Sequence, residues 1–203
     1  MNANIANNAN PIVVVRLRDT SITMSNRDAT IEGAPRDWYE MIEVADTVKA
    51  LNPVSLTITE SVDLFAVKEI LRNLDLGNNN TLRSLTLKQL WQEGIQVLAQ
   101  ELQGNITLTS LNIDPLLVGY YQDGSIVKDF SPGTEGTYAE NIHDILLNNR
   151  ALNSFAITLP IALYEQNQNQ ARFGNFDFND VNLVEANIVG NCVEVELIAP
   201  EAL

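Results

Sequence analysis

Three segments of the chain share one leucine spacing, and this repetition constrains the fold more than any other feature of the sequence. The first segment, LRSLTL, begins at Leu82, and the second, LTSLNI, begins 26 residues later at Leu108. The third, LNSFAI, begins at Leu152, a further 44 residues along the chain. A pattern L-x-x-L-x-L that returns after roughly 20 to 30 residues is typical of stacked repeats, in which each unit buries its apolar side chains against the next.

Amphipathic helices are predicted before or between these segments. Apolar residues recur at helical spacing in 37–51, 63–74, 92–102 and 139–147. Strands are expected at 11–17, 54–58, 82–87, 108–113, 151–157 and 193–198. Because strands and helices alternate, we expect parallel strands joined by helical crossovers. The asparagine-rich residues 1–10 are expected to form a disordered tail, and residues 11–203 a single domain.

The repeated segments resemble the leucine-rich repeat family, in the ribonuclease-inhibitor-like subtype. The resemblance covers roughly 45–158 and is carried best by one repeat, with its consensus residues at Gly94, Leu98, Leu102, Asn105, Leu108, Leu111 and Ile113. It implies an α/β solenoid that forms a short arc, with parallel strands on the concave face and helices on the convex face. The asparagine turn that the family carries after the strand is missing here. We therefore expect an irregular array with atypical capping ends.

The charge balance bears on which partners the chain can bind. It carries 26 acidic and 12 basic residues, which gives a net charge of -14. Such an acidic surface disfavours binding to nucleic acid or to anionic lipid. No apolar run reaches the roughly 18 residues that a membrane span requires, and the first residues lack the features of a signal peptide. We therefore expect a cytoplasmic protein with no nucleic-acid or membrane partner.

Residue types that support catalysis or metal binding are scarce. Cys192 is the only cysteine, so neither an internal disulfide nor a cysteine-based metal site is expected. His143 is the only histidine, and it falls on a predicted helix where a solvated position is the simplest interpretation. The motif NFDFND resembles a calcium loop only faintly, because it lacks the turn glycine and the distal glutamate. The sequence predicts no catalytic residue, no metal site and no cofactor.

One candidate binding surface is the strand face that points away from the leucines. The residue between the two leucines of each L-x-L points away from the core. Overlaying the segments predicts two rows of small residues on this face: Ser55, Ser84, Ser110 and Ser154 in one, and Thr57, Thr86, Asn112 and Ala156 in the other. Lys88 and Asp114 begin a charged third row. The alternative interpretation is a solvated face that binds nothing.

The second candidate surface is an insertion at 114–137. The Asp-Gly pair in YYQDGSIV predicts a β-hairpin, and the insertion lengthens one repeat by 18 residues. Tyr120, Tyr121 and Phe130 give it an aromatic content that is typical of an interaction loop. The alternative is that these side chains fold back and cover the edge of a repeat.

These patterns predict a non-enzymatic protein-protein interaction module. We expect another protein to bind at the edge of the concave face nearest the insertion, with Tyr120, Tyr121 and Phe130 as anchors above a polar floor of Thr86, Lys88, Asn112 and Asp114. Two alternatives are a hydrolase or transferase with a site between the insertion and the concave face, and a self-associating structural protein. A monomer or weak self-association is expected. A short array without a catalytic domain looks bacterial, and an effector delivered into a host cell by a non-classical secretion route is a further hypothesis.

Overall fold

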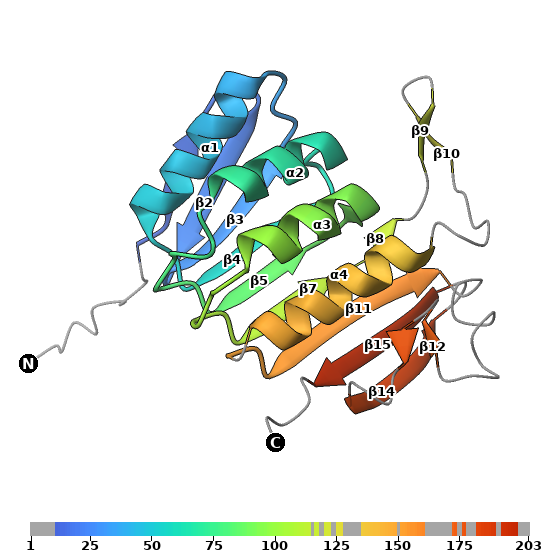
Figure 1. Ribbon diagram of the computed structural model, residues 1–203. Helices are drawn as coiled ribbons and strands as arrows, with labels where there is room; N and C mark the ends of the chain where they lie inside the picture. Colours follow the sequence, from blue (N-terminus) through green and yellow to red (C-terminus); the bar gives the residue numbers. More distant parts are fainter. Residues whose placement is uncertain are drawn as a thin grey trace, which may run out of the picture.

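The computed structural model describes residues 11–114, 116–117, 120–122, 125–127, 135–149, 151–160, 172–173, 176–177, 182–189 and 192–198. Within these residues, nine strands form one mixed sheet, and four helices lie side by side along one face of it (Figure 1). The α/β class that the sequence predicts is therefore confirmed.

The centre of the sheet is a parallel array. Its strands lie in the order β3 (Asp28–Gly33), β4 (Ser55–Ile58), β5 (Ser84–Leu87), β7 (Ser110–Ile113) and β11 (Ser154–Pro160). The connections contain α1 (Trp38–Leu51), α2 (Leu64–Asn73), α3 (Gln92–Glu101) and α4 (Glu135–Asn148). Because each strand is added on the same side of the one before it, and crossovers share one hand, every helix falls on the same face.

Both edges of the sheet are antiparallel, which the sequence interpretation did not predict. At one edge, β1 (Val13–Arg16), β2 (Thr20–Ser25) and β3 form a meander. The second and third of these strands were missed, although Asn26 and Arg27 form the positive-φ turn that joins such hairpins. At the other edge, β15 (Cys192–Ile198) runs antiparallel to β11 and pairs with β14 (Asn182–Val189). The expectation that all strands continue the parallel order was wrong at both ends.

Three two-stranded sheets complete the described elements. Strand β6 (Leu90–Trp91) pairs in parallel with β8 (Leu116–Leu117). Strands β9 (Tyr120–Gln122) and β10 (Ser125–Val127) pair where the Asp-Gly signal predicts a hairpin, and β12 (Arg172–Phe173) pairs with β13 (Phe176–Asp177). Within the segment 114–137 that the sequence assigns to the insertion, α4 begins at Glu135, and β8 pairs with the strand before α3.

The core lies between the sheet and the four helices. Alternate residues of the central strands are buried and face the helices: Leu56, Ile58, Leu85, Leu87, Leu111, Ile113, Phe155 and Ile157. The helices bury a matching stripe: Val44, Val48, Val67, Ile70, Ile95, Leu98, Ile142 and Ile145. This alternation follows from the period of two in a strand and the 3.6-residue period of a helix. Trp38 departs from its predicted apolar position, since 46% of its surface is exposed.

Asparagines before the strands accept hydrogen bonds from the turns that lead into those strands. Asn79 Oδ1 accepts hydrogen bonds from the backbone nitrogens of Thr81 and Leu82, at 2.9 and 2.8 Å. Asn105, at the equivalent place before β7, accepts the equivalent two bonds, and its Nδ2 donates to the backbone oxygen of Leu76. These side chains satisfy backbone groups that the turns would otherwise bury without partners.

Candidate functional site

The sheet face opposite the helices carries the rows of small residues that the sequence predicts. Ser55, Ser84, Ser110 and Ser154 are register partners across four parallel strands, and Thr57, Thr86, Asn112 and Ala156 follow in the next row. Each of these residues is partly exposed, whereas the leucines and isoleucines between them are buried. We call this surface the open face, because no described helix covers it.

A third row crosses the sheet at the carboxyl ends of the parallel strands. The backbone nitrogens of Thr59, Lys88 and Asp114 donate to the oxygens of Ile31, Ile58 and Leu87, at 3.1, 2.9 and 2.9 Å. Parallel pairing therefore continues one residue past the strands. On the antiparallel side, Ser21 pairs with Glu32 and with Arg16. We call the resulting line the carboxyl-end row, which comprises Arg16, Ser21, Glu32, Thr59, Lys88 and Asp114.

Lys88 and Asp114, two of the predicted binding residues, meet in this row. Their Nζ and Oδ2 atoms are 3.5 Å apart, and the two side chains are 42% and 43% exposed. An ion pair this exposed contributes only about 0–1 kcal/mol to stability. Either side chain can therefore leave this pair and contact a bound partner instead, at little cost to the stability of the fold.

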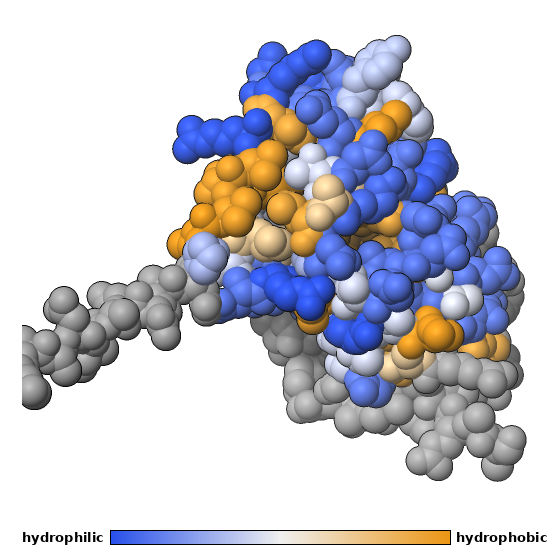
Figure 2. Space-filling model, turned by 90° about the vertical axis from the view of Figure 1, so that its left-hand side faces the viewer, coloured by the Kyte–Doolittle hydropathy of each residue, from blue (hydrophilic) through white to orange (hydrophobic). Residues whose placement is uncertain are grey.

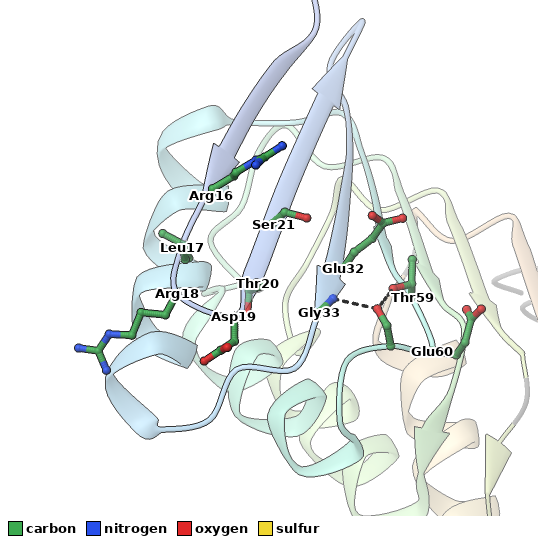
Figure 3. Close-up of a pocket in the computed structure, with 11 residues that line it drawn as sticks. Arg16, Leu17, Arg18, Asp19, Thr20, Ser21, Glu32, Gly33, Thr59 and Glu60 are labelled. Atoms are coloured by element: carbon green, nitrogen blue, oxygen red, sulfur yellow. Dashed lines mark hydrogen bonds between the residues drawn. The ribbon is translucent and has the colours of Figure 1, made fainter.

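A cavity of about 600 Å³ lies at the opposite end of the carboxyl-end row (Figure 3). Its walls are the β1–β2 turn, the end of β3 and the loop 59–61 that follows β4. Ligands of sheets with parallel strands commonly bind beyond the carboxyl ends of those strands, because the connecting loops gather there. The cavity lies at that end of β3 and β4.

Hydrogen bonds hold the wall formed by the loop 59–61. The backbone nitrogen of Gly33 donates to Ser61 Oγ at 2.8 Å, and the hydroxyls of Thr59 and Ser61 lie 2.7 Å apart. Gln89 Nε2 donates to the backbone oxygens of Glu60 and Val62, at 2.8 and 2.9 Å. The loop is therefore fixed while the Glu60 side chain stays exposed.

The opposite wall is tied to the start of α1. Arg18 pairs with Asp37 at 2.9 Å, and Asp19 pairs with Arg36 at 3.1 Å. The carboxylate of the buried Glu40 accepts hydrogen bonds from the backbone nitrogens of Asp19 and Arg36. The charges of Arg18 and Asp19 are therefore matched by neighbours.

Three charged side chains of the cavity have no ion-pair or hydrogen-bond partner among the described residues. Arg16, Glu32 and Glu60 line it, and none of them forms a hydrogen bond or ion pair through its side chain with another described residue. Thr20 also lines the cavity, and within the described part of the chain its buried hydroxyl has no hydrogen-bond partner. Sequence reasoning missed this group because it missed β2 and β3. The alternation in TSITMS and DATIEG around Asn26 was the signal that could have found them.

The predicted aromatic anchors are described only in part. Tyr120 and Tyr121 lie on β9, whose hairpin stands apart from the helices in Figure 1, and the structure describes only their backbone. Phe130 lies outside the described residues. Whether these three residues meet Thr86, Asn112, Lys88 and Asp114 therefore stays a prediction.

Other candidate chemistry is limited in the part of the chain that the structure describes. No group of three or more His, Cys, Asp or Glu side chains there could hold a metal ion. His143 lies on α4 and Cys192 begins β15, each described by its backbone alone. None of the four described helices is both long enough and apolar enough to cross a membrane.

Comparison with models of known protein families gives no match for this sequence, and comparison with curated proteins gives none either.

Proposed function

We propose that the chain is a non-enzymatic protein-binding module, built as a short, irregular leucine-rich-repeat-like solenoid. Its partner is another protein, which it binds through the open face and the inserted hairpin. The observation that carries this proposal is the open face itself. Four parallel strands present small and mostly polar side chains in register, and every described helix lies on the other side (Figure 1).

The size of the open face argues that the hairpin takes part in binding. With strands about 4.8 Å apart and residues rising about 3.3 Å, three rows on five strands cover only about 400 Å². A stable protein complex buries about 800 Å² on each partner. Serine and threonine rows also offer few anchors, so the tyrosines of β9 are the residues that complete the interface.

The proposal is tested by paired arginine substitutions on the two faces. In one variant, Thr86→Arg and Asn112→Arg crowd the open face. In the control, Gln96→Arg and Gln100→Arg add the same charge to exposed positions of α3. A protein captured by the native chain should bind the control and be lost from the open-face variant. Loss from the α3 variant alone would place the interface on the helices and overturn the proposal.

A hydrolase or transferase is the second candidate, and Glu32 and Glu60 in one cavity are the observation that favours it. The cavity lies at the β1–β4 end of the sheet rather than beside the insertion. The nearby hydroxyls of Thr59 and Ser61 bond to each other, and that of Thr59 also bonds to the Ile31 oxygen. Turnover of a chromogenic ester or glycoside that disappears in both Glu32→Gln and Glu60→Gln would replace the binding-module proposal.

Self-association is the third candidate. Strand β1 forms the edge of the sheet, and Ile12, Val13 and Val14 are 67%, 39% and 50% exposed. Figure 2 shows apolar side chains gathered on this side of the molecule. An apolar edge strand is a template for pairing with another chain. Light scattering at two protein concentrations, on the native chain and on Val14→Lys, separates a self-associating protein from a monomeric binder.

A further inference from the structure

Arg16, Glu32 and Glu60 come to the cavity from three separate segments. Arg16 lies on β1, Glu32 on β3, and Glu60 in the loop after β4. Ser21 of β2 lies between Arg16 and Glu32 (Figure 3). Because two strand spacings separate them, the backbones of Arg16 and Glu32 are about 10 Å apart. The two side chains therefore stand on either side of Ser21 in the wall of the cavity.

The missing partners distinguish these three side chains from the other charges around the cavity. Arg18 and Asp19 are paired with Asp37 and Arg36. Within the described residues, the positive charge of Arg16 and the negative charges of Glu32 and Glu60 remain unpaired. A ligand that complements them carries one carboxylate and two cationic groups. Because the whole chain has a net charge of -14, a ligand with a net positive charge is also favoured by the overall field.

The cavity is suited to a small ligand in its size and in its rigidity. It is an open hollow in the surface rather than an enclosed cavity, and its volume of about 600 Å³ is large enough for a ligand the size of an amino acid. The hydrogen bonds of Gly33, Ser61 and Gln89 hold one wall, and Glu40 holds the other. A site that is ordered before binding loses less entropy when the ligand arrives.

We propose that this cavity binds a small ligand that carries one carboxylate and two cationic groups, with its carboxylate at Arg16 and its two cations at Glu32 and Glu60. The same charges can come from a free amino acid, such as lysine or arginine, or from a short segment of a protein that carries two basic residues and one acidic residue. This site is separate from the Lys88–Asp114 end of the carboxyl-end row, and it does not depend on the proposed protein-binding function.

The test is an NMR titration of the full chain at low ionic strength, where exposed charges are least screened. The probes are L-lysine, lysine amide (which lacks the carboxylate) and the blocked tripeptide acetyl-Lys-Lys-Glu-amide. L-lysine should shift the amide signals of Ser21, Gly33 and Ser61 and reach saturation. Lysine amide should bind about fivefold more weakly, as expected for the loss of one exposed charge pair.

Charge-removing variants assign the contacts. Arg16→Gln should abolish the preference for L-lysine over lysine amide. Glu32→Gln and Glu60→Gln should each weaken L-lysine binding about fivefold. Glu43→Gln, which removes the same charge from an exposed position of α1, should leave the affinity unchanged. The fold of each variant is checked by its amide spectrum outside the cavity.

Each outcome of the titration either supports one source of the ligand or overturns the proposal. Saturable binding of L-lysine supports a free amino acid as the ligand, and binding of the tripeptide without L-lysine supports a protein segment. Shifts spread over the whole acidic surface, or an equal loss of affinity in Glu43→Gln, would show counterion binding and overturn the proposal. Absence of cavity shifts with all three probes would also overturn it. The protein-binding proposal would stand in either case, because its own test uses Thr86 and Asn112.

Discussion

Asn105 and Leu76 are joined by a hydrogen bond, in which the side-chain nitrogen of the buried Asn105 donates to the Leu76 backbone oxygen. The same side chain accepts hydrogen bonds from the backbone nitrogens of Thr107 and Leu108, at 2.9 and 2.8 Å. One residue thus joins two successive helix–strand connections. Asn149 occupies the equivalent position before β11 and is also buried, but its side-chain oxygen and nitrogen have no hydrogen-bond partner among the described residues.

This contrast predicts that replacement by alanine lowers the free energy of unfolding by different amounts at the two asparagines. Asn105→Ala should lower the free energy of unfolding by about 2–3 kcal/mol, because it leaves buried backbone groups without partners. Asn149→Ala should cost less than about 1 kcal/mol, since it removes polar atoms that are already unpaired. Urea denaturation of the two variants measures the difference. A loss in Asn149→Ala equal to that in Asn105→Ala would contradict the prediction.

The unpaired hydroxyl of Thr20 predicts a substitution that does not destabilise the protein. Thr20→Val keeps the shape of the side chain and removes a buried polar group, so the melting temperature should stay unchanged or rise. The control is Thr59→Val, because the hydroxyl of the native Thr59 donates to the Ile31 oxygen at 3.0 Å. That variant should lose about 1 kcal/mol. A lower melting temperature for Thr20→Val than for Thr59→Val would contradict the assignment.

Two glycines with positive φ allow the cost of backbone strain to be measured apart from the cost of steric overlap. Gly33 has a φ of 108°, and a Cβ there would lie 2.2 Å from the Asp19 oxygen. Gly104 has a φ of 79°, and no atom lies within 4 Å of the position of its Cβ. Gly104→Ala should therefore cost about 1 kcal/mol, from the backbone conformation alone. Gly33→Ala should cost clearly more, because the β1–β2 turn must also move. Thermal unfolding of both variants measures the two losses of stability. Equal losses in Gly33→Ala and Gly104→Ala would contradict the prediction.

Glu101 gives the protein a component of stability that depends on pH. Burial, together with the charge of Asp75, raises the pKa of Glu101 above its ordinary value of 4.5, and Arg72 opposes the shift. A raised pKa means that the folded chain holds this proton more tightly than the unfolded chain does. The contribution of Glu101 to the free energy of unfolding is therefore most favourable below pH 4.5, and it is lost as the pH rises through the folded-state pKa. Glu101→Gln should therefore be more stable than the native chain at neutral pH.

The measurement is the unfolding free energy of both chains across this range of pH. The advantage of Glu101→Gln should shrink on acidification and vanish below pH 4.5. An advantage that stays constant with pH would show that the effect comes from packing rather than from charge. Asp75→Asn, which removes the neighbouring negative charge, should lower the pKa of Glu101 and reduce the same pH dependence.

The parallel core and the rows of the open face were predictable from the sequence, because their signals are local. The spacing of Leu85 and Leu87 is enough to identify a half-buried strand, and its repetition at Leu111 and Ile113 sets the register. A slip of one residue would turn every leucine toward water. The stacking of Ser84 on Ser110, and of Thr86 on Asn112, follows from that constraint alone.

The edges of the sheet and the cavity were decided by tertiary structure. The alternation in β2 and β3 marks them as strands, but it does not say that β2 pairs with β1 and β3 with β4, and the tertiary structure decides that pairing. Arg16, Glu32 and Glu60 are distant in the sequence, and no local pattern links them. They share one cavity because an antiparallel meander meets a parallel array at the same end of the sheet. Periodicity determines which face a residue takes, whereas the order of the strands determines which residues become neighbours.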